Sequence, residues 1–296
     1  MEQEWNDTCS IPQANYWAGE ALARRLRQIF ENGRRYHGYH DGAYFMPNDK
    51  REQDRMDMEH RIFRMVLNGK LYLSPLAQSP GRVLDLGTGA GPWAMDFAEA
   101  PQNCTFEIDD FEDEWPYDTS RPFNFIHARN IAGCVADYDR LFAQAFKHLS
   151  PGGYLELQSS EANIFSDDGT IERAVTARQW RNILVLSSKK FGKRLGVEDG
   201  WKKQMEQAGF VDVVDQVFKV PFRPWPKDPK LKELGLWQSK HINEAIESYS
   251  LALFTRVLGW TVEELDVLLT GVRNDFADPH SHLYGRIRFV YGRKPE

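Results

Sequence analysis

The chain has 296 residues, which at about 150 residues per domain allows one large domain or two small ones. Its 37 Lys and Arg against 43 Asp and Glu give a net charge of −6. This balance argues against a general DNA- or RNA-coating protein, which needs a basic surplus to pair with phosphates. Three cysteines without a CxxC pair argue against a disulfide scaffold or a zinc site. No secretory signal or membrane-length apolar run is present, so we expect a cytoplasmic or nuclear protein without a membrane partner.

Two helices separated by a glycine-rich loop are predicted at the start of the chain. The first covers residues 15–29, where apolar residues recur near helical spacing. The second begins near Asn48, which can cap it, and continues through His60 to Gly69. We therefore expect residues 1–80 to form N-terminal helices and a lid.

Strands and helices alternate in the rest of the chain, which predicts an α/β fold with a mainly parallel sheet. The predicted strands cover residues 82–86, 103–108, 123–128, 154–158, about 210–222 and 286–295. The predicted helices cover residues 94–100, 139–149, 171–188, 201–208, 241–258 and 262–274. We expect residues 81–296 to form the core, with an insert of about 171–285 as a roof over a substrate.

The most specific motif is VLDLGTGAGPW, residues 83–93. Asp85 lies near the end of a short strand, and Gly87, Gly89 and Gly91 follow as G-x-G-x-G. Glycines let the backbone turn tightly and approach a ligand closely. A dinucleotide site requires G-x-G-x-x-G, and this loop has only one residue between its second and third glycines. An acid two residues before the first glycine is instead the pattern of class I S-adenosylmethionine methyltransferases, which disfavours a nicotinamide enzyme and, less strongly, a structural turn.

The segments that follow the glycine loop come in an order that resembles one protein family. They are an acidic strand end (IDDFEDEW), a strand (FNFIHAR), an amphipathic helix and a turn with a strand (PGGYLELQ). The segments YHGYHDGAYFMPNDKREQDRMDMEH, LGWTVEELDVLL and YGRKP extend the similarity from about residue 30 to the end. The chain is similar to fungal LaeA-like (UMTA-type) methyltransferases. The resemblance implies a Rossmann-like class I sheet with flanking helices, a helical N-terminal lid, a C-terminal helical insert and S-adenosylmethionine as cofactor.

The resemblance also assigns site residues. Asp85 and the three glycines are expected to hold the methionine end of the cofactor, and Asp110 with Phe111 to meet its adenine. Ala128 and Arg129 are expected to line the mouth of the methyl-transfer site together with His127. The lid and substrate side is expected to comprise Tyr36, Tyr39, Tyr44 and Trp93, with Tyr44 on the cofactor.

His127 is also the candidate general base, because it ends a strand where α/β proteins bind ligands and histidine titrates near pH 6.5. A packing role is the alternative, since methyl transfer often requires only alignment and desolvation. His280 and His282 lie two residues apart in a predicted loop with few partners, so we expect no metal site there.

The chain departs from its family directly after the helix at 94–100. The usual order continues with a second strand, which ends in an acid that binds both ribose hydroxyls, and a second helix. Residues 101–104 cannot hold both, because such a crossover needs at least ~10–12 residues. Three explanations are open. A true deletion would weaken cofactor binding; the strand at 103–108 could fill the vacant position and bring Asp109 and Asp110 to the ribose; or the gene product has a segment that this sequence lacks.

The sequence thus predicts methyl transfer from S-adenosylmethionine to O, N or S of a small secondary metabolite or a protein. The alternative is a non-catalytic or cofactor-impaired relative that acts as a regulatory partner in secondary metabolism. We expect no nucleic-acid partner, given the acidic balance of the chain.

Overall fold

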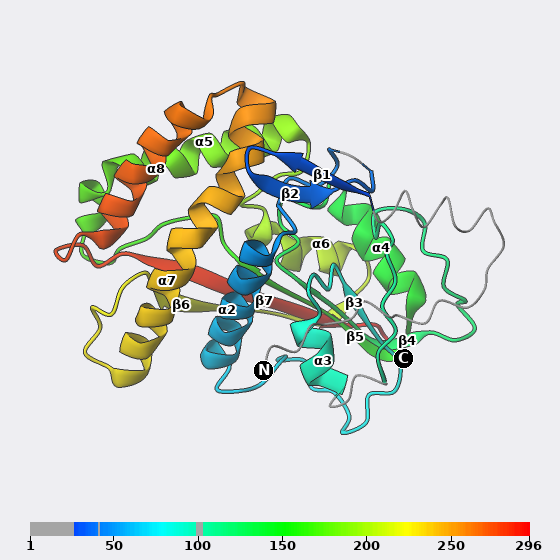
Figure 1. The fold of residues 1–296 in the computed structure, drawn as a ribbon. Coiled ribbons are helices and arrows are strands. Elements are labelled where there is room, and N and C mark those ends of the chain that lie inside the picture. The colour runs from blue at the N-terminus through cyan, green and yellow to red at the C-terminus, as the bar shows by residue number, and fades with distance from the viewer. Residues whose placement is uncertain (1–26, 41, 99–102) are drawn as a thin grey trace, which may run out of the picture. The chain divides into compact units, whose positions relative to one another are not determined.

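The computed structural model describes residues 27–40, 42–98 and 103–296 (Figure 1). The chain forms two units, Met1–Asp49 and Lys50–Glu296. This boundary differs from the one predicted near residue 80. The reason is that helix α2 (Lys50–Val66) packs along helix α7 (Pro229–Ala252) and so belongs to the second unit.

The first unit contains a β-hairpin where it is described. Strand β1 (Gln28–Glu31) pairs antiparallel with β2 (Arg34–His37). The turn residues Asn32 and Gly33 have φ angles of 50° and 75°, as a two-residue hairpin turn requires. The helix predicted over 15–29 is therefore wrong at its end, and the rest of it lies outside the described residues. The expected helical lid is a hairpin in its described part.

The second unit is built on a five-stranded sheet with the order β3-β4-β5-β7-β6. The strands are β3 (Val83–Leu86), β4 (Phe123–Arg129), β5 (Leu149–Ser160), β6 (Val211–Pro221) and β7 (Tyr284–Arg293). β3, β4 and β5 run parallel, as predicted, while β7 pairs antiparallel with both β5 and β6. The sheet is the α/β, Rossmann-like core that the sequence predicts.

The predicted strand at 103–108 is absent from the structure. Residues 104–110 have no regular secondary structure, and within the described ranges β3 pairs with β4 alone. Phe106 and Ile108 are 54% and 41% exposed. Alternating apolar residues suit a strand only where a neighbouring strand can pair with the backbone N–H and C=O groups. The explanation in which this segment fills the vacant sheet position is therefore contradicted, and β3 lies at the edge of the sheet.

Helices flank the sheet, and those from η2 onward lie within residues 170–277. They are α3 (Pro92–Ala98), α4 (Tyr138–His148), α5 (Val175–Phe191), α6 (Trp201–Gln207) and α8 (Val262–Ala277), with the short helices η2 (Thr170–Arg173), η3 (Glu198–Gly200) and η4 (Leu253–Val257). α5 and α8 pack together (Figure 1). The predicted insert of about 171–285 also contains β6, so part of it belongs to the sheet. None of the described helices is both long and apolar enough to cross a membrane.

A buried apolar cluster fixes α2 against the sheet. Its members are Ile62, Phe63 and Leu67 of α2, Leu234 of α7, Val220 of β6, and Ile287 and Phe289 of β7. The rings of Phe63 and Phe289 meet edge to face, with 5.9 Å between their centroids. Burying each such side chain contributes about 1.5–3 kcal/mol to stability. The cluster holds the preceding turns of α2, which carry polar residues, in a fixed place beside the parallel strands.

Candidate functional site

The glycine loop between β3 and α3 has the backbone that its sequence predicts. Gly87, Gly89 and Gly91 have φ angles of +64°, +60° and +84°. These left-handed conformations disfavour a residue with a Cβ by roughly 1–2 kcal/mol. Gly87 and Gly89 are exposed, so the backbone of the loop is open to a ligand.

Two side chains from other segments, Met56 and Phe106, lie against this loop. A Cβ built on Gly89 would lie 2.0 Å from Cε of Met56, and one built on Gly91 would lie 3.0 Å from Cε1 of Phe106. The left-handed backbone is what favours glycine at position 89, because the end of the Met56 side chain could move aside for a Cβ. The flexible end of Met56 brings α2 into direct contact with the loop.

Asp85, at the end of β3, is held by a buried histidine. Nδ1 of His127 lies 2.7 Å from Oδ1 of Asp85. The His127 imidazole stacks on the Trp93 indole, with 3.7 Å between ring centroids and 5° between planes. His127 is 0% exposed and Trp93 2% exposed. Both side chains are thus buried, and the base role of His127 and the substrate role of Trp93 stay predictions.

The bond fixes one proton of His127. The carboxylate of Asp85 can only accept, so Nδ1 of His127 carries a proton and donates it to Oδ1. Nε2 is buried and has no partner among the described residues. The arrangement fixes one oxygen of Asp85 from inside the protein.

Arg129, at the end of β4, belongs to a second polar chain. Its Nη1 lies 3.0 Å from Nδ1 of His60, whose Nε2 lies 3.0 Å from Oδ2 of Asp96. Arg64 also donates to that Asp96 oxygen, at 2.7 Å. Burial lowers the pKa of Arg129, while the charge of Asp85 acts to raise it. Burial also lowers the pKa of His60, which favours its neutral form.

A third polar group lies between α2 and α7 and was missed by the sequence reasoning. The Arg55 guanidinium donates to Glu52 at 2.9 Å, to Glu59 at 2.8 Å and to Nε2 of His241 at 2.7 Å. All four side chains are buried. Burial is the largest single influence and acts to lower the pKa of Arg55, but the charges of Glu59, Tyr249 and Glu52 together outweigh it and hold the pKa well above its ordinary value. Burial lowers the pKa of His241 to about 4.

The sequence held a signal for these α2 residues. Positions 52, 55, 56, 59, 60 and 63 recur at intervals of three and four, which places them on one helical face. Charged residues that share a face with Met56 and Phe63 are candidates for burial and pairing.

The expected adenine side is a turn that touches the glycine loop. Oδ1 of Asp110 accepts a hydrogen bond from the backbone N–H of Glu112 at 3.0 Å, and the Trp115 indole donates to the carbonyl of Phe111 at 2.9 Å. A Cβ on Gly87 would lie 3.5 Å from Cε1 of Phe111. The turn thus places Phe111 beside the loop, while Asp110 and its neighbour Asp109 do not end a strand.

The remaining predicted residues fall in two places. Ala128 is fully buried on β4, and its role at the methyl-transfer site stays a prediction. Tyr36, Tyr39 and Tyr44 belong to the first unit, where Tyr39 stacks on His40 with 4.2 Å between ring centroids. Their roles as lid residues stay predictions.

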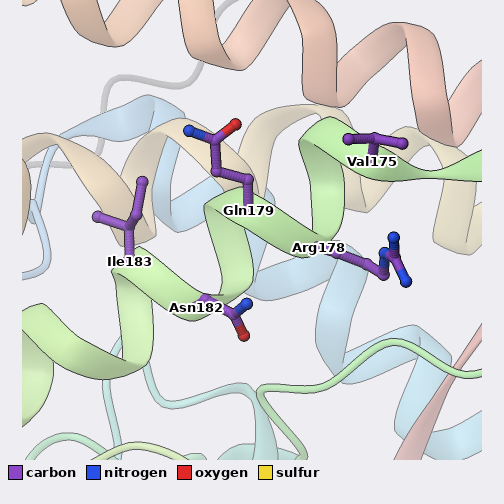
Figure 2. Close-up of a pocket in the computed structure, with 5 residues that line it drawn as sticks. All are labelled: Val175, Arg178, Gln179, Asn182 and Ile183. Atoms are coloured by element: carbon purple, nitrogen blue, oxygen red, sulfur yellow. The ribbon is translucent and has the colours of Figure 1, made fainter.

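A surface pocket of about 430 Å³ lies elsewhere, on α5. Its lining residues are Val175, Arg178, Gln179, Asn182 and Ile183, all from one helix (Figure 2). None of them belongs to the polar chains described above. This pocket has no cluster of chemically active groups, and the glycine loop with its neighbours is the stronger candidate site.

Comparison with known proteins identifies the family of the chain. A family profile described as "Methyltransferase domain" matches residues 58–215, which include the glycine loop, Arg129 and part of α2. "Methyltransferase pytC" of Aspergillus terreus is 38% identical over 289 residues, covering 91% of this chain and 89% of that protein. "Secondary metabolism regulator laeA" of Aspergillus fumigatus is 31% identical, covering 90% and 76%. "Protein-methionine methyltransferase laeA" of Emericella nidulans is 29% identical, covering 98% and 82%.

The fold and the site therefore define a methyltransferase. More narrowly, the chain belongs to the fungal LaeA-like class I methyltransferases, as its sequence segments predict. The cofactor of this class is S-adenosylmethionine.

The residues present fit the methionine end of that cofactor. The loop backbone is exposed at Gly87 and Gly89, Oγ1 of Thr88 is buried without a partner among the described residues, and Asp85 and Arg129 are close enough to interact electrostatically. The ribose end fits less well, because no second strand follows α3 in the described sheet to present an acid.

Proposed function

We propose that this methyltransferase binds S-adenosylmethionine at the glycine loop and transfers its methyl group to O, N or S of a small secondary metabolite or a protein. The observation that carries the proposal is the position of Asp85, held by His127 at the end of β3 directly before the exposed glycines. A carboxylate at that place can receive the ammonium group of the methionine moiety.

When bound, the cofactor supplies an electrophilic methyl group on a sulfonium. A lone pair of the acceptor would take this methyl group as the S–CH₃ bond breaks, and the electron pair would stay on sulfur as the thioether of S-adenosylhomocysteine. The residues of this chain align the two partners and exclude water. His127 acts in this account by orienting Asp85, and the acceptor's proton leaves to solvent.

We propose that Phe111 and Asp110 lie at the adenine, supported by the approach of the Phe111 ring to Gly87. The backbone at Ala128 and the side chain of Arg129 then face the methionine end. The proposal also includes three residues predicted from the sequence. Tyr44 would contact the cofactor, and Tyr36 and Tyr39 would contact the substrate.

The acceptor is tested with the full chain and S-adenosylmethionine that carries a tritiated methyl group. Incubation with a fungal extract, followed by separation of proteins from small molecules, should move label into one fraction. Asp85→Asn should lower this transfer at least tenfold at limiting cofactor, because a charged hydrogen bond is lost. Absence of transfer to either fraction would contradict the enzymatic role. The cytoplasmic or nuclear location stays a prediction, which fluorescence microscopy of the tagged chain tests.

One observation favours a second candidate, a cofactor-impaired regulatory partner. β3 is an edge strand in the described sheet, so the ribose lacks a strand-end acid. Two relatives bear different names, one a "Secondary metabolism regulator" and one a "Protein-methionine methyltransferase", which supports either role. Calorimetry with S-adenosylmethionine separates them, since a regulatory partner without cofactor gives no heat of binding and no thermal shift.

A further inference from the structure

We propose that His60 is a positioning residue that orients Arg129 toward the carboxylate of the methionine moiety. Asp85 and Arg129 then form a clamp for the two charges of the amino acid, with ammonium on Asp85 and carboxylate on Arg129. This inference rests on the proposed function, because it assigns the atoms of the same cofactor site.

The bonds around His60 allow only one arrangement of protons. Arg129 is a donor with no acceptor atom, so Nδ1 of His60, 3.0 Å from its Nη1, must be unprotonated. Nε2 of His60 therefore carries the proton and donates to Oδ2 of Asp96, 3.0 Å away. Asp96 fixes the ring, and the ring in turn fixes the guanidinium. His60 is only 8% exposed, so solvent cannot easily replace it.

Asp85 and Arg129 each have atoms that remain able to form hydrogen bonds with a ligand. Oδ1 of Asp85 is taken by His127, and Oδ2 receives no hydrogen bond from the described residues. One N–H of Arg129 goes to His60, which leaves other donors of its planar fork for a carboxylate. The guanidinium also lies over the Phe63 ring, 5.2 Å from the ring centroid, and this contact limits how far the Arg129 side chain can move.

The two ends of the clamp come from neighbouring strands. Asp85 is opposite His127 in the parallel register of β3 and β4, and Arg129 follows two residues later on the same strand. Residues two apart on a strand point to the same face. Because His127 reaches Asp85, the side chain of Arg129 lies on that face as well, at the carboxyl ends of the strands.

The test compares two ligands that differ in the amino acid group. S-adenosylhomocysteine contains it, and 5′-methylthioadenosine has the same nucleoside thioether without it. Calorimetry or competition binding on the full chain gives both affinities. His60→Ala should lower the affinity for S-adenosylhomocysteine about tenfold, as expected for a lost charge-assisted contact. The affinity for 5′-methylthioadenosine should stay within about twofold of wild type.

Three further variants keep the test decisive. His60→Asn retains an acceptor near the Nδ1 position and should bind S-adenosylhomocysteine nearly as wild type, whereas His60→Gln places its amide near Nε2 and should behave like His60→Ala. If His60→Ala fails to fold, the comparison of His60→Asn with His60→Gln tests the inference instead. Arg64→Ala removes the other partner of Asp96 on the same helix and should change neither affinity.

Equal weakening of both ligands in His60→Ala and His60→Gln would overturn the inference, because it would show a general structural role. Unchanged binding of S-adenosylhomocysteine would overturn it too. If wild type binds both ligands, the proposed function survives either result. If wild type binds neither, the proposed function fails and the clamp fails with it.

Discussion

Nδ1 of His127 lies 2.7 Å from Oδ1 of Asp85, and the imidazole stacks on the Trp93 indole with 3.7 Å between ring centroids. The acid that precedes the glycine loop is thus fixed from the interior of the protein. We propose that His127, which the sequence makes a candidate general base, instead orients the carboxylate of Asp85.

His127→Asn tests this role, because an asparagine amide can still donate to Asp85 from near the Nδ1 position. We expect it to retain cofactor affinity within about threefold, whereas His127→Ala loses the donor and leaves a cavity that costs about 2–4 kcal/mol of stability. Calorimetry and urea denaturation measure the two effects. His148→Asn is the matched control, since His148 is also buried but bonds the carbonyl of Gln144. A loss of kcat at full cofactor affinity in His127→Asn would instead restore the general base.

The edge position of β3 predicts that the ribose hydroxyls contribute little to binding. S-adenosylhomocysteine and its 2′-deoxy analogue should therefore differ in affinity by less than about threefold, well below the cost of a lost charged hydrogen bond. Asp109→Asn should likewise change the affinity by less than about threefold. A preference of tens of fold for the 2′-hydroxyl, removed by Asp109→Asn or Asp110→Asn, would show that this segment grips the ribose.

We expect the buried ion pairs of Arg55 with Glu52 and Glu59 to have a large effect on the free energy of unfolding. Arg55→Met leaves Glu52 and Glu59 in the interior without their cation, which should lower the free energy of unfolding by about 3–5 kcal/mol. Urea denaturation measures the change. Lys50→Ala removes an exposed ion pair with Asp54 on the same helix and should change it by less than about 0.5 kcal/mol. Equal effects of the two substitutions would mean that the buried charges are solvated.

Glu198 predicts a pH dependence of stability. Burial raises the pKa of this carboxyl to about 7, despite a hydrogen bond from Ser159. The folded chain therefore keeps a proton on Glu198 that the unfolded chain releases near pH 4.5. The stability that this proton contributes is full below pH 4.5 and is lost as the pH rises through 7. Glu198→Gln should flatten the fall of unfolding free energy between pH 5 and 7. The same slope in the variant and wild type would exclude Glu198 as its source.

The glycine loop and the parallel strands could be predicted because their signals are local. Asp85 and the glycines lie within seven residues, and the Thr261–Glu264 capping box that starts α8 spans four. The β1–β2 hairpin had an equally local signal in Asn32-Gly33, but the apolar spacing before it favoured a helix. The φ angles that this turn requires outweigh the apolar periodicity of the residues before it.

Other features depend on contacts that no local pattern contains. Residues 103–108 alternate like a strand, yet no neighbouring strand is available to pair with them in the described sheet. His60 and Arg129 are 69 positions apart, and Arg55 and His241 are 186 apart. Only the packing of α2 on α7 and the sheet brings such pairs together.

The binding of S-adenosylmethionine to the full chain tests the central claim most directly. Isothermal titration of wild type and Asp85→Asn should give a saturable one-to-one isotherm for wild type and an affinity at least tenfold weaker for the variant. Equal affinity in the two proteins, or no heat with wild type at millimolar cofactor, would contradict the account.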